Sequence, residues 1–201
     1  MKKIIINAII TLNFITFFPH IIIFLFHRNR RKIHEDVSKW INILFSGENV
    51  NIIWGLIYFI TFFPEFRNIF YKRIGFLGIF LNVYCRKMST LYINTPEKNI
   101  AGGLFIQHGF ATIISAKSIG NNAWINQQVT IGYSNSTDCP TLLDNIVVYA
   151  GAKIIGDVTI GNNSKVGANA VVVKNIPDNC TVVGVPAFIV RRDGIKCKER
   201  L

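Results

Sequence analysis

Residues 149–177 read YAGAKIIGDVTIGNNSKVGANAVVVKNIP, and in this stretch an aliphatic side chain returns at every sixth position. The four positions are Ile154, Ile160, Val166 and Val172. A short repeat of fixed length is typical of solenoid proteins, in which each repeat packs mainly against its neighbours. The stretch therefore predicts a solenoid built from hexapeptides.

The same period continues toward the N-terminus. Upstream members are Leu142 and Val148, and an earlier run has the same spacing: Ile113, Ile119, Ile125 and Ile131. Two residues before each aliphatic lies a mostly small, apolar side chain: Ala111, Ala123, Val129, Ile146, Ala152, Val158, Ser164 and Ala170. The step from Ile131 to Leu142 is about five residues too long, which places a loop at residues 132–141. We predict a parallel β-helix with three short sides per coil and a column of inward aliphatics.

The first 90 residues have a different composition. Residues 4–26, IIINAIITLNFITFFPHIIIFLF, contain no charged side chain and are long enough to cross a bilayer core of about 30 Å as one helix. A second apolar run at 50–64 is shorter and predicts a buried or interfacial helix. In the following EFRNIFYKRIG we expect Phe and Tyr inward and the cations outward. The alternative for these runs is ordinary packed helices of a helical domain.

The charge distribution separates the same regions. The chain has 22 basic and 11 acidic residues; residues 1–96 carry twelve and four of them, while residues 97–190 are neutral overall. A nucleic-acid-binding module needs a basic face, so the neutral repeats predict no nucleic-acid partner. Basic residues beside apolar runs favour an anionic membrane surface, and the basic cluster after residue 26 predicts a cytoplasmic location at the inner face of the membrane.

We therefore predict three parts: a hydrophobic helical, membrane-associated domain at 1–90, a hexapeptide-repeat β-helix at 91–190 and a basic C-terminal tail at 191–201. Half of the residues are hydrophobic, which excludes a disordered chain. The four cysteines have no C-x-x-C spacing, which predicts a reducing compartment and no zinc ribbon.

Four strings carry a resemblance to a known family: GGLFIQHG (102–109), WINQQVTIG (124–132), residues 149–177 quoted above, and VVGVPAFIVRR (182–192). Over residues 94–192 the chain resembles the hexapeptide-repeat acyltransferases, and by motif it is most similar to serine acetyltransferases and polysaccharide O-acetyltransferases. The resemblance implies a mainly β fold, a left-handed parallel β-helix after the hydrophobic helical domain. It also implies acetyl-CoA as co-substrate, no metal, and a homotrimer with the cofactor in a groove between adjacent subunits.

His108 is the only histidine after residue 34, and it matches the catalytic histidine of the family. One imidazole suffices to remove the proton from an acceptor hydroxyl, which then attacks the thioester. The alternative is a histidine hydrogen-bonded at a coil corner. A γ-type carbonic anhydrase is excluded, because its zinc site needs three histidines.

The other expected site residues fall into two groups. Near the acceptor we expect Gln107, Asn126 and Gln127, although such amides equally form ladders that satisfy the coil backbone. By resemblance the cofactor-binding residues are Ala150, Gly151, Gly167 and Ala168 along the pantetheine arm, and Lys174, Arg191 and Arg192 at the phosphates. Simple coil geometry and a solvated tail are the respective alternatives.

The chain departs from the serine acetyltransferases at three positions. Their orienting Asp, fifteen residues before the histidine, is Ile93 here, and the Asp directly before the histidine is Gln107. Asn94, Glu97 or a backbone carbonyl is expected to orient His108 instead. Their second histidine aligns with Cys139, which we expect to be an inert loop thiol.

These departures favour a sugar hydroxyl in cell-surface polysaccharide biosynthesis as the acceptor of an acetyl-CoA-dependent O-acetyltransferase. The alternative is L-serine O-acetylation in cysteine biosynthesis. An inactive trimeric β-helix scaffold is the alternative of another class.

Overall fold

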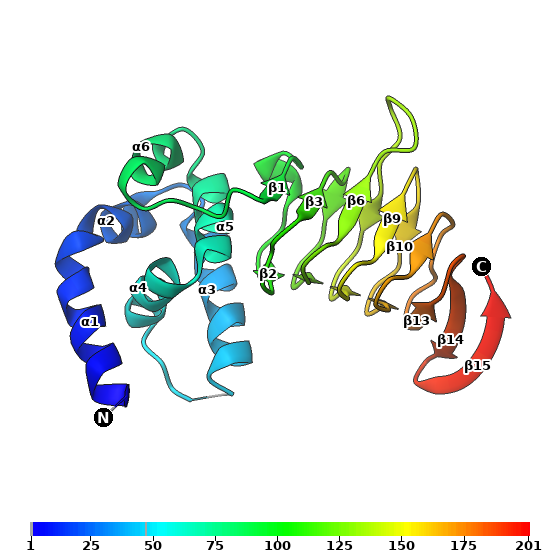
Figure 1. The fold of residues 1–201 in the computed structure, drawn as a ribbon, viewed down its shortest axis with the longest axis horizontal. Helices are drawn as coiled ribbons and strands as arrows, with labels where there is room; N and C mark the ends of the chain where they lie inside the picture. Colours follow the sequence, from blue (N-terminus) through cyan, green and yellow to red (C-terminus); the bar gives the residue numbers. More distant parts are fainter. Residues whose placement is uncertain (1, 47) are drawn as a thin grey trace. The chain divides into compact units, whose positions relative to one another are not determined.

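The computed structural model describes residues 2–46 and 48–201, and the chain divides between residues 88 and 89 into two compact units (Figure 1). The first unit is helical. Its elements are α1 (Lys2–Thr16), α2 (Phe18–Phe26), α3 (Arg30–Leu44), α4 (Ile52–Phe62), α5 (Pro64–Ile74) and α6 (Leu77–Tyr84).

The long apolar run at residues 4–26 forms two helices and not one. α1 and α2 meet at Phe17 with a bend of 70° between their axes. Pro19 lies in the first turn of α2, where a missing N–H costs no helical hydrogen bond, so the sequence favours a new helix start there. The run is long enough to cross a bilayer as one helix, but it does not form one continuous helix. In the described residues no single helix is long and apolar enough to cross a membrane, and only the bent pair meets that length and composition.

The apolar run at 50–64 forms α4, which lies in the core of the helical unit. Leu56, Ile57 and Ile60 are fully buried, so the prediction of a buried helix is confirmed. Trp40 of α3 lies between the rings of Phe59 and Phe66, at centroid distances of 5.4 and 5.1 Å. Aromatic packing thus joins α3, α4 and α5.

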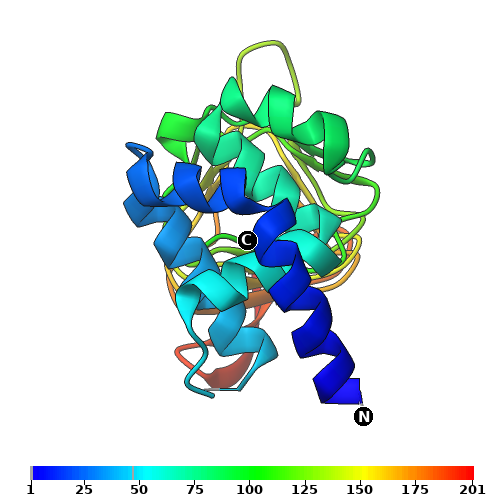
Figure 2. The ribbon, with the colours of Figure 1, turned by 90° about the vertical axis from the view of Figure 1, so that its left-hand side faces the viewer.

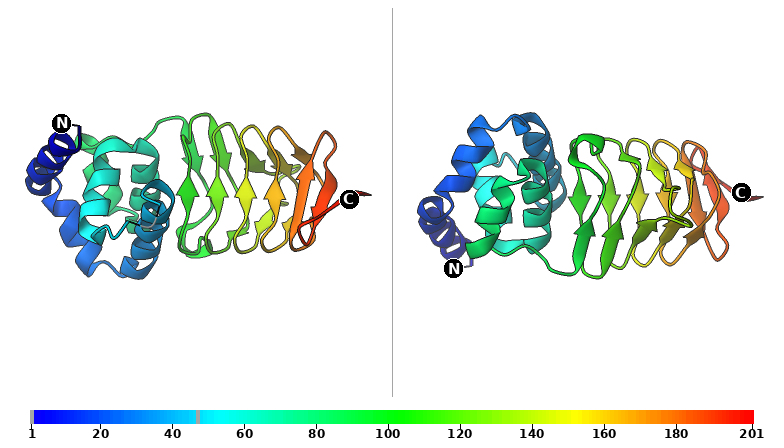
Figure 3. Two further views of the ribbon diagram at one scale, coloured as in Figure 1. Left: turned by 90° about the horizontal axis from the view of Figure 1, so that it is seen from below. Right: turned by 90° about the horizontal axis from the view of Figure 1, so that it is seen from above.

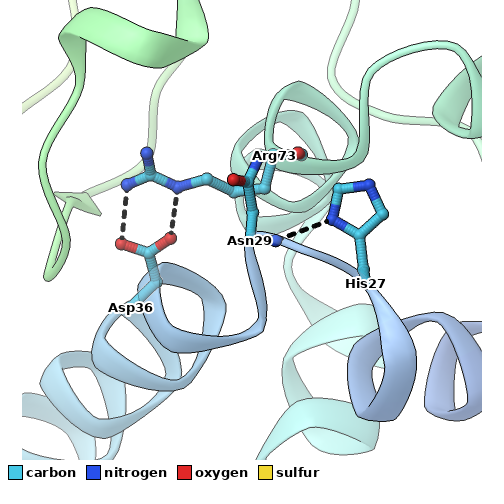
Figure 4. Close-up of polar contacts among 4 residues, drawn as sticks. All are labelled: His27, Asn29, Asp36 and Arg73. Atoms are coloured by element: carbon cyan, nitrogen blue, oxygen red, sulfur yellow. Dashed lines mark hydrogen bonds and ion pairs between the residues drawn. The ribbon is translucent and has the colours of Figure 1, made fainter.

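A buried ion pair also connects α3 to α5 (Figure 4). Arg73 donates from Nε and Nη2 to the two carboxylate oxygens of Asp36 at 2.8 and 3.1 Å, and both side chains are almost fully buried. Asn29 donates from Nδ2 to the carbonyl oxygen of Arg73 at 2.7 Å. The expectation that the cations of this stretch point outward is therefore wrong for Arg73, because Asp36 provides an inward partner.

A second polar cluster is built around His20 of α2. The Tyr71 hydroxyl donates to the carbonyl oxygen of Cys85 at 2.7 Å and lies 3.2 Å from His20 Nε2, so that nitrogen is the donor of the pair. His20 Nδ1 then accepts from the Tyr84 hydroxyl at 3.1 Å. Burial, aided by the charge of Arg67, lowers the pKa of His20 to about 4.

The second unit is a parallel β-helix, and Figure 3 shows its coils stacked side by side. After β1 (Leu91–Ile93) and the short 3-10 helix η1 (Glu97–Asn99), the strands are β2 (Phe105–Ile106), β3 (Thr112–Ile114), β4 (Ser118–Ile119), β5 (Trp124–Ile125), β6 (Thr130–Gly132), β7 (Thr141–Leu142), β8 (Val147–Val148), β9 (Lys153–Ile155), β10 (Thr159–Ile160), β11 (Lys165–Val166), β12 (Val171–Val172), β13 (Cys180–Val183), β14 (Phe188–Arg192) and β15 (Ile195–Arg200). They form three sheets, in the orders β1-β3-β6-β9-β12, β10-β7-β4 and β15-β14-β13-β11-β8-β5-β2. The predicted three-sided parallel coil is confirmed.

Nine of the ten predicted inward aliphatics are buried, and the exception is informative. Ile113 is 41% exposed, whereas Ile114 is fully buried and pairs in register with Ile131. Likewise Ala111 is exposed and Thr112 is buried in its place. The prediction is therefore off by one residue in the first coil only, because the inward residues Ile114 and Ile119 are five and not six residues apart. The predicted loop between Ile131 and Leu142 is confirmed as the connection from β6 to β7.

An asparagine ladder stabilises one corner of the coils. Each Nδ2 donates to the Oδ1 of the next coil at 3.0 to 3.3 Å, and all four residues have positive φ: Asn122, Asn145, Asn163 and Asn179. Asparagine tolerates this left-handed conformation better than most residues. The ladder lies at a different corner from Asn126 and Gln127, so those two amides do not belong to it.

The last residues form a β-hairpin where a solvated basic tail was expected at 191–201. β14 and β15 extend the largest sheet in antiparallel pairing. Arg192 pairs with Glu199 at 2.6 Å across the two strands. The basic residues of this segment therefore belong to a folded edge.

Candidate active site

The corner that carries His108 is longer than the equivalent corner of every later coil. Successive inward residues on its two sides, Ile106 and Ile114, are eight residues apart. In the next three coils the corresponding pairs are six apart: Ile125 and Ile131, Val148 and Ile154, Val166 and Val172. Two extra residues are therefore inserted in the first coil, between β2 and β3.

His108 and Gly109 form this insertion. Both have positive φ, of 63° and 61°, and two short backbone bonds close the turn, from Gly109 N to the oxygen of Gln107 and from Phe110 N to the oxygen of His108, each 2.8 Å. Glycine adopts this conformation freely, but for histidine it is uncommon and marks a locally constrained site. The turn leaves His108 exposed to solvent and not packed between coils.

The His108 ring makes no hydrogen bond with any residue in the described part of the chain. Asn94, one expected orienting group, donates from Nδ2 to Ser115 Oγ at 2.9 Å, and Ile93 pairs with Ile114 inside a sheet. Within this chain the imidazole is thus positioned by its backbone turn. It is open to a substrate hydroxyl, which is the geometry that a general base needs.

Gln107 is held back against the sheet beside His108. Its Oε1 accepts a hydrogen bond from Trp124 Nε1 at 3.3 Å, and its backbone N–H bonds to the oxygen of Ile125. Trp124 in turn meets Phe105 edge-to-face with ring centroids 5.0 Å apart. Sequence reasoning missed Trp124, whose partly exposed indole flanks the corner.

Asn126 and Gln127 lie at the same corner, one coil further along. The side-chain oxygens Asn126 Oδ1 and Gln127 Oε1 are both buried and accept no hydrogen bond from any described residue. A buried acceptor without a partner is costly, and native proteins rarely leave one without a reason. Both residues are partly exposed, so rotation of either amide would present it to the solvent side of the corner beside His108.

The predicted glycines and alanines also stack at this corner. Asn169 N donates to the oxygen of Ala150, so Gly151 and Asn169 occupy equivalent positions in adjacent coils. Gly151 has a φ of 75°, and an added Cβ would overlap Asn169 Oδ1; at Gly167 it would lie 2.7 Å from Val183 Cγ1. The coil geometry thus demands both glycines, and Asn169 and Tyr149 occupy the equivalent positions of the adjacent coils.

The predicted phosphate-binding cations do not all lie together. Lys174 faces a hollow of about 700 Å³ and donates from Nζ to the Leu201 oxygen at 2.7 Å. Arg191 bonds to the oxygen of Gly194 and Arg192 to Glu199, and neither lines the hollow. The hollow is lined by Val171, Val173, Lys174, Val185, Pro186, Ala187, Phe188, Lys198, Glu199, Arg200 and Leu201.

Lys198 and Arg200 are the cations that sequence reasoning missed. They line the hollow together with Lys174. Both belong to β15, which forms where a solvated tail was expected. No sequence signal marked them, because a basic stretch of this kind is equally consistent with a solvated tail. Lys174 thus lies in one hollow with Lys198 and Arg200, whereas Arg191 and Arg192 bond within the hairpin; a phosphate-binding role for Lys174 stays a prediction.

The loop between β6 and β7 is ordered by Asp138. Its Oδ1 accepts from the backbone N–H groups of Ser134 and Asn135 at 2.9 Å each, and Oδ2 accepts from the Ser134 hydroxyl. The Ser134 hydroxyl bond in particular lowers the pKa of Asp138. Cys139 follows as a partly exposed free thiol. Across residues 2–46 and 48–201, no three His, Cys, Asp or Glu side chains gather in a way that could hold a metal ion.

Comparison with known families finds the same repeat. A family model described as bacterial transferase hexapeptide (six repeats) matches residues 140–174. The chain is 31% identical over 168 residues to a serine acetyltransferase of Bacillus pumilus, covering 81% of this chain and 73% of that protein. It is 34% identical over 132 residues to a serine acetyltransferase of Synechococcus elongatus, covering 64% of this chain and 54% of that one.

Solved structures match over both units. A serine acetyltransferase of Neisseria gonorrhoeae in complex with serine has a TM-score of 0.59 and 27% identity, with 80% of this chain and 68% of that chain covered. A serine acetyltransferase in complex with CoA has a TM-score of 0.60 and 24% identity, with 80% and 69% covered. The expected fold class, a hexapeptide-repeat β-helix after a helical domain, is confirmed by these matches.

Proposed function

Because the chain belongs to the serine acetyltransferase family, we propose that it transfers the acetyl group of acetyl-CoA to the hydroxyl of L-serine, with His108 as the general base. The observation that carries this proposal is the two-residue insertion, which exposes His108 to solvent. At the same corner, the side-chain oxygens of Asn126 and Gln127 are buried and accept no hydrogen bond from a described residue. The named relatives support L-serine as the acceptor, and one of them was solved with serine bound.

The proposed reaction needs one protein group that gains and then returns a proton. Neutral His108 removes the proton from the acceptor hydroxyl, and the oxygen attacks the carbonyl carbon of the thioester. The carbon–sulfur bond breaks as the carbon–oxygen ester bond is completed. His108 then gives the proton to the departing thiolate, which leaves as free CoA. No acyl-enzyme forms, so the mechanism needs no nucleophilic role for Cys139.

The edge of the coils offers a place for an extended cofactor. Ala150–Gly151 and Gly167–Ala168 have no large side chains, and a pantetheine arm can lie against their backbone. The hollow with Lys174, Lys198 and Arg200 combines cations with an apolar floor, which suits phosphates next to a flat base. The coil of β12, which lines it, lies three coil steps of about 4.8 Å, roughly 14 Å, from the coil of His108.

A homotrimer is part of this proposal. In the family that the sequence resembles, the cofactor groove is completed by an adjacent subunit, and here the corner of His108 is open on its solvent side. Light scattering tests the assembly: the proposal expects three copies, and a monomer with full activity would contradict it.

A sugar hydroxyl is the second candidate acceptor, and a specific observation favours it. L-serine carries both an ammonium and a carboxylate, but Ile93, Gln107 and Cys139 occupy the positions where the resemblance expects two carboxylates and an imidazole. Gln107 Oε1 is already bonded to Trp124, while Asn126 and Gln127 offer neutral acceptors that match hydroxyl groups. The acceptor side of the corner is therefore built of amides.

Thiol release from acetyl-CoA, measured with purified full-length protein, separates these acceptors. L-serine is compared with a panel of sugars and oligosaccharides, and His108→Asn serves as the inactive control. Saturable, His108-dependent turnover with L-serine supports the first proposal; turnover with a sugar alone would replace L-serine by the second candidate. Gln107→Asp should raise kcat/KM for L-serine and not for a sugar, because it adds a carboxylate for the ammonium, while Gln107→Asn is the matched neutral control.

A further inference from the structure

Three helices of the first unit expose large apolar side chains to solvent. On α1 these include Leu12 and Ile15, on α2 Phe18 and Phe26, and on α6 Ile79 and Val83, with exposed fractions between 59% and 81%. We call these six residues the apolar face. Large exposed apolar surfaces are uncommon on monomeric proteins and mark interaction sites.

The three helices are neighbours, because α2 contacts α1 and is joined to α6. α1 and α2 lie nearest the viewer in Figure 2. α6 is tied to α2 by the hydrogen bond between Tyr84 and His20 and by the stacked rings of Phe17 and Tyr84, 6.5 Å apart. An apolar hollow of about 500 Å³, lined by Phe14, Ile15, Phe18, Ile21 and Ile53, opens between α1, α2 and α4.

Basic residues flank this region, and acidic residues are missing from it. Residues 1–34 and 66–96 contain no Asp or Glu. Arg28 and Arg30 follow α2, and Arg86 and Lys87 follow α6; all four are exposed. Arg31 pairs with Glu35 at 2.9 Å, on the solvent side of α3. The apolar helices thus carry their charges at the ends and are uncharged in between.

We propose that the apolar face docks on the surface of an anionic lipid bilayer, with α1 and α2 lying in the interface. Apolar side chains enter the region below the headgroups, while the flanking Arg and Lys side chains reach the lipid phosphates. The bend of 70° between α1 and α2 is compatible with helices that follow a surface. This inference does not depend on which hydroxyl is acetylated.

The charge pattern favours lipid over a second copy of the chain. In a two-fold symmetric dimer the same patch meets itself, so the edge that carries Arg28, Arg30, Arg86 and Lys87 would face a second edge that is also basic. α1, α2 and α6 contain no acidic side chain that could pair with them. A bilayer containing anionic phosphates supplies the opposite charge all along the edge.

Vesicle flotation of the full chain tests the proposal. Vesicles of phosphatidylcholine are compared with a roughly 3:1 mixture of phosphatidylcholine and phosphatidylglycerol. We expect binding to the anionic vesicles that is at least about tenfold stronger and that weakens in about 0.5 M NaCl. Ile15→Glu should reduce this binding at least about tenfold, because it places a charge in the apolar contact.

Two further variants define the outcome. Ile195→Glu changes an equally exposed apolar residue of β15, outside the face, and should leave binding within about twofold of wild type. The double variant Arg28→Glu, Arg30→Glu should bind anionic and neutral vesicles equally weakly. The proposal is overturned if the chain stays with the soluble fraction in both vesicle preparations, or if Ile15→Glu and Ile195→Glu reduce binding alike. It is also overturned if Ile15→Glu only converts a larger assembly into a smaller one, which would identify a second copy as the occupant.

Discussion

Replacement of His108 by Asn should remove the general base and keep the backbone turn, so the variant distinguishes an effect on turnover from an effect on folding. The residue has a φ of 63°, a conformation that asparagine adopts readily and that an alanine adopts at a cost of about 1–2 kcal/mol. The side chain is exposed and makes no hydrogen bond within the described residues, so no packing is lost. We therefore expect His108→Asn to change the free energy of unfolding by less than about 0.5 kcal/mol.

The effect on turnover should be far larger. A positioned general base contributes about 10²- to 10⁴-fold to the rate, which corresponds to roughly 3–5 kcal/mol of transition-state stabilisation. Asparagine cannot accept the hydroxyl proton, so kcat should fall by that factor. The KM for acetyl-CoA should stay nearly constant, because the proposed cofactor hollow lies about three coil steps away.

The assay is steady-state thiol release at saturating acetyl-CoA, with urea denaturation of the same preparations. A second variant, deletion of residues 108–109, makes this corner as long as those of the next three coils and should fold with similarly low turnover. If His108→Asn retains turnover within about fivefold of wild type, His108 is not the base, and the functional importance assigned to the insertion is refuted.

Three further predictions concern stability, each measured by urea denaturation. Gly151→Ala should cost about 1–3 kcal/mol, because φ is 75° and the added Cβ overlaps the neighbouring coil; Gly132→Ala, with nothing within 4 Å, should change stability by less than about 1 kcal/mol. Arg73→Met should cost about 3–5 kcal/mol by leaving the Asp36 carboxylate buried without its partner, and Asp36→Leu added to it should recover most of that loss. His20 has a pKa of about 4 in the folded protein and its ordinary pKa of 6.5 in the unfolded chain, so the unfolded chain binds its proton first as the pH falls. The free energy of unfolding should therefore be unaffected by His20 above pH 6.5 and should fall by up to about 3 kcal/mol as the pH is lowered toward 4. The variant His20→Gln should show a smaller dependence of stability on pH over this range.

The β-helix could be predicted from the sequence because its core is one-dimensional. Each coil adds its aliphatic side chains to the same buried column, so an aliphatic at every sixth position predicts the fold directly. Nine of the ten aliphatics predicted to point inward are buried. The helical unit lacks such a repeat. Its run at 4–26 reads as uniformly apolar, and hydrophobicity alone does not show that the chain bends at Phe17 or that Arg73 finds Asp36 across two helices.

The candidate site was predicted less completely, because it depends on contacts between distant residues. His108 could be found from its rarity and its motif, but the partners of Lys174 could not. Lys198 and Arg200 reach the same hollow only because β15 folds back along β14, and nothing in a basic stretch of sequence distinguishes such a hairpin from a solvated tail. The unpaired oxygens of Asn126 and Gln127 likewise follow from burial and not from residue type.

The first coil departs from the sixfold period twice, and the adjacent isoleucines at 113 and 114 hide both departures. The sixfold count upstream from Ile119 ends on Ile113, but the inward residue is Ile114, five residues before Ile119. Counting downstream from Ile106 removes the ambiguity: six residues further is Thr112, and the inward position is reached only at Ile114, after eight. A solenoid coil tolerates extra residues only at a corner, where they are extruded toward solvent and leave the stacked column intact. The inserted pair, which contains the one histidine of the repeats, is therefore needed for function and not for folding. Its deletion should leave the fold intact and abolish turnover.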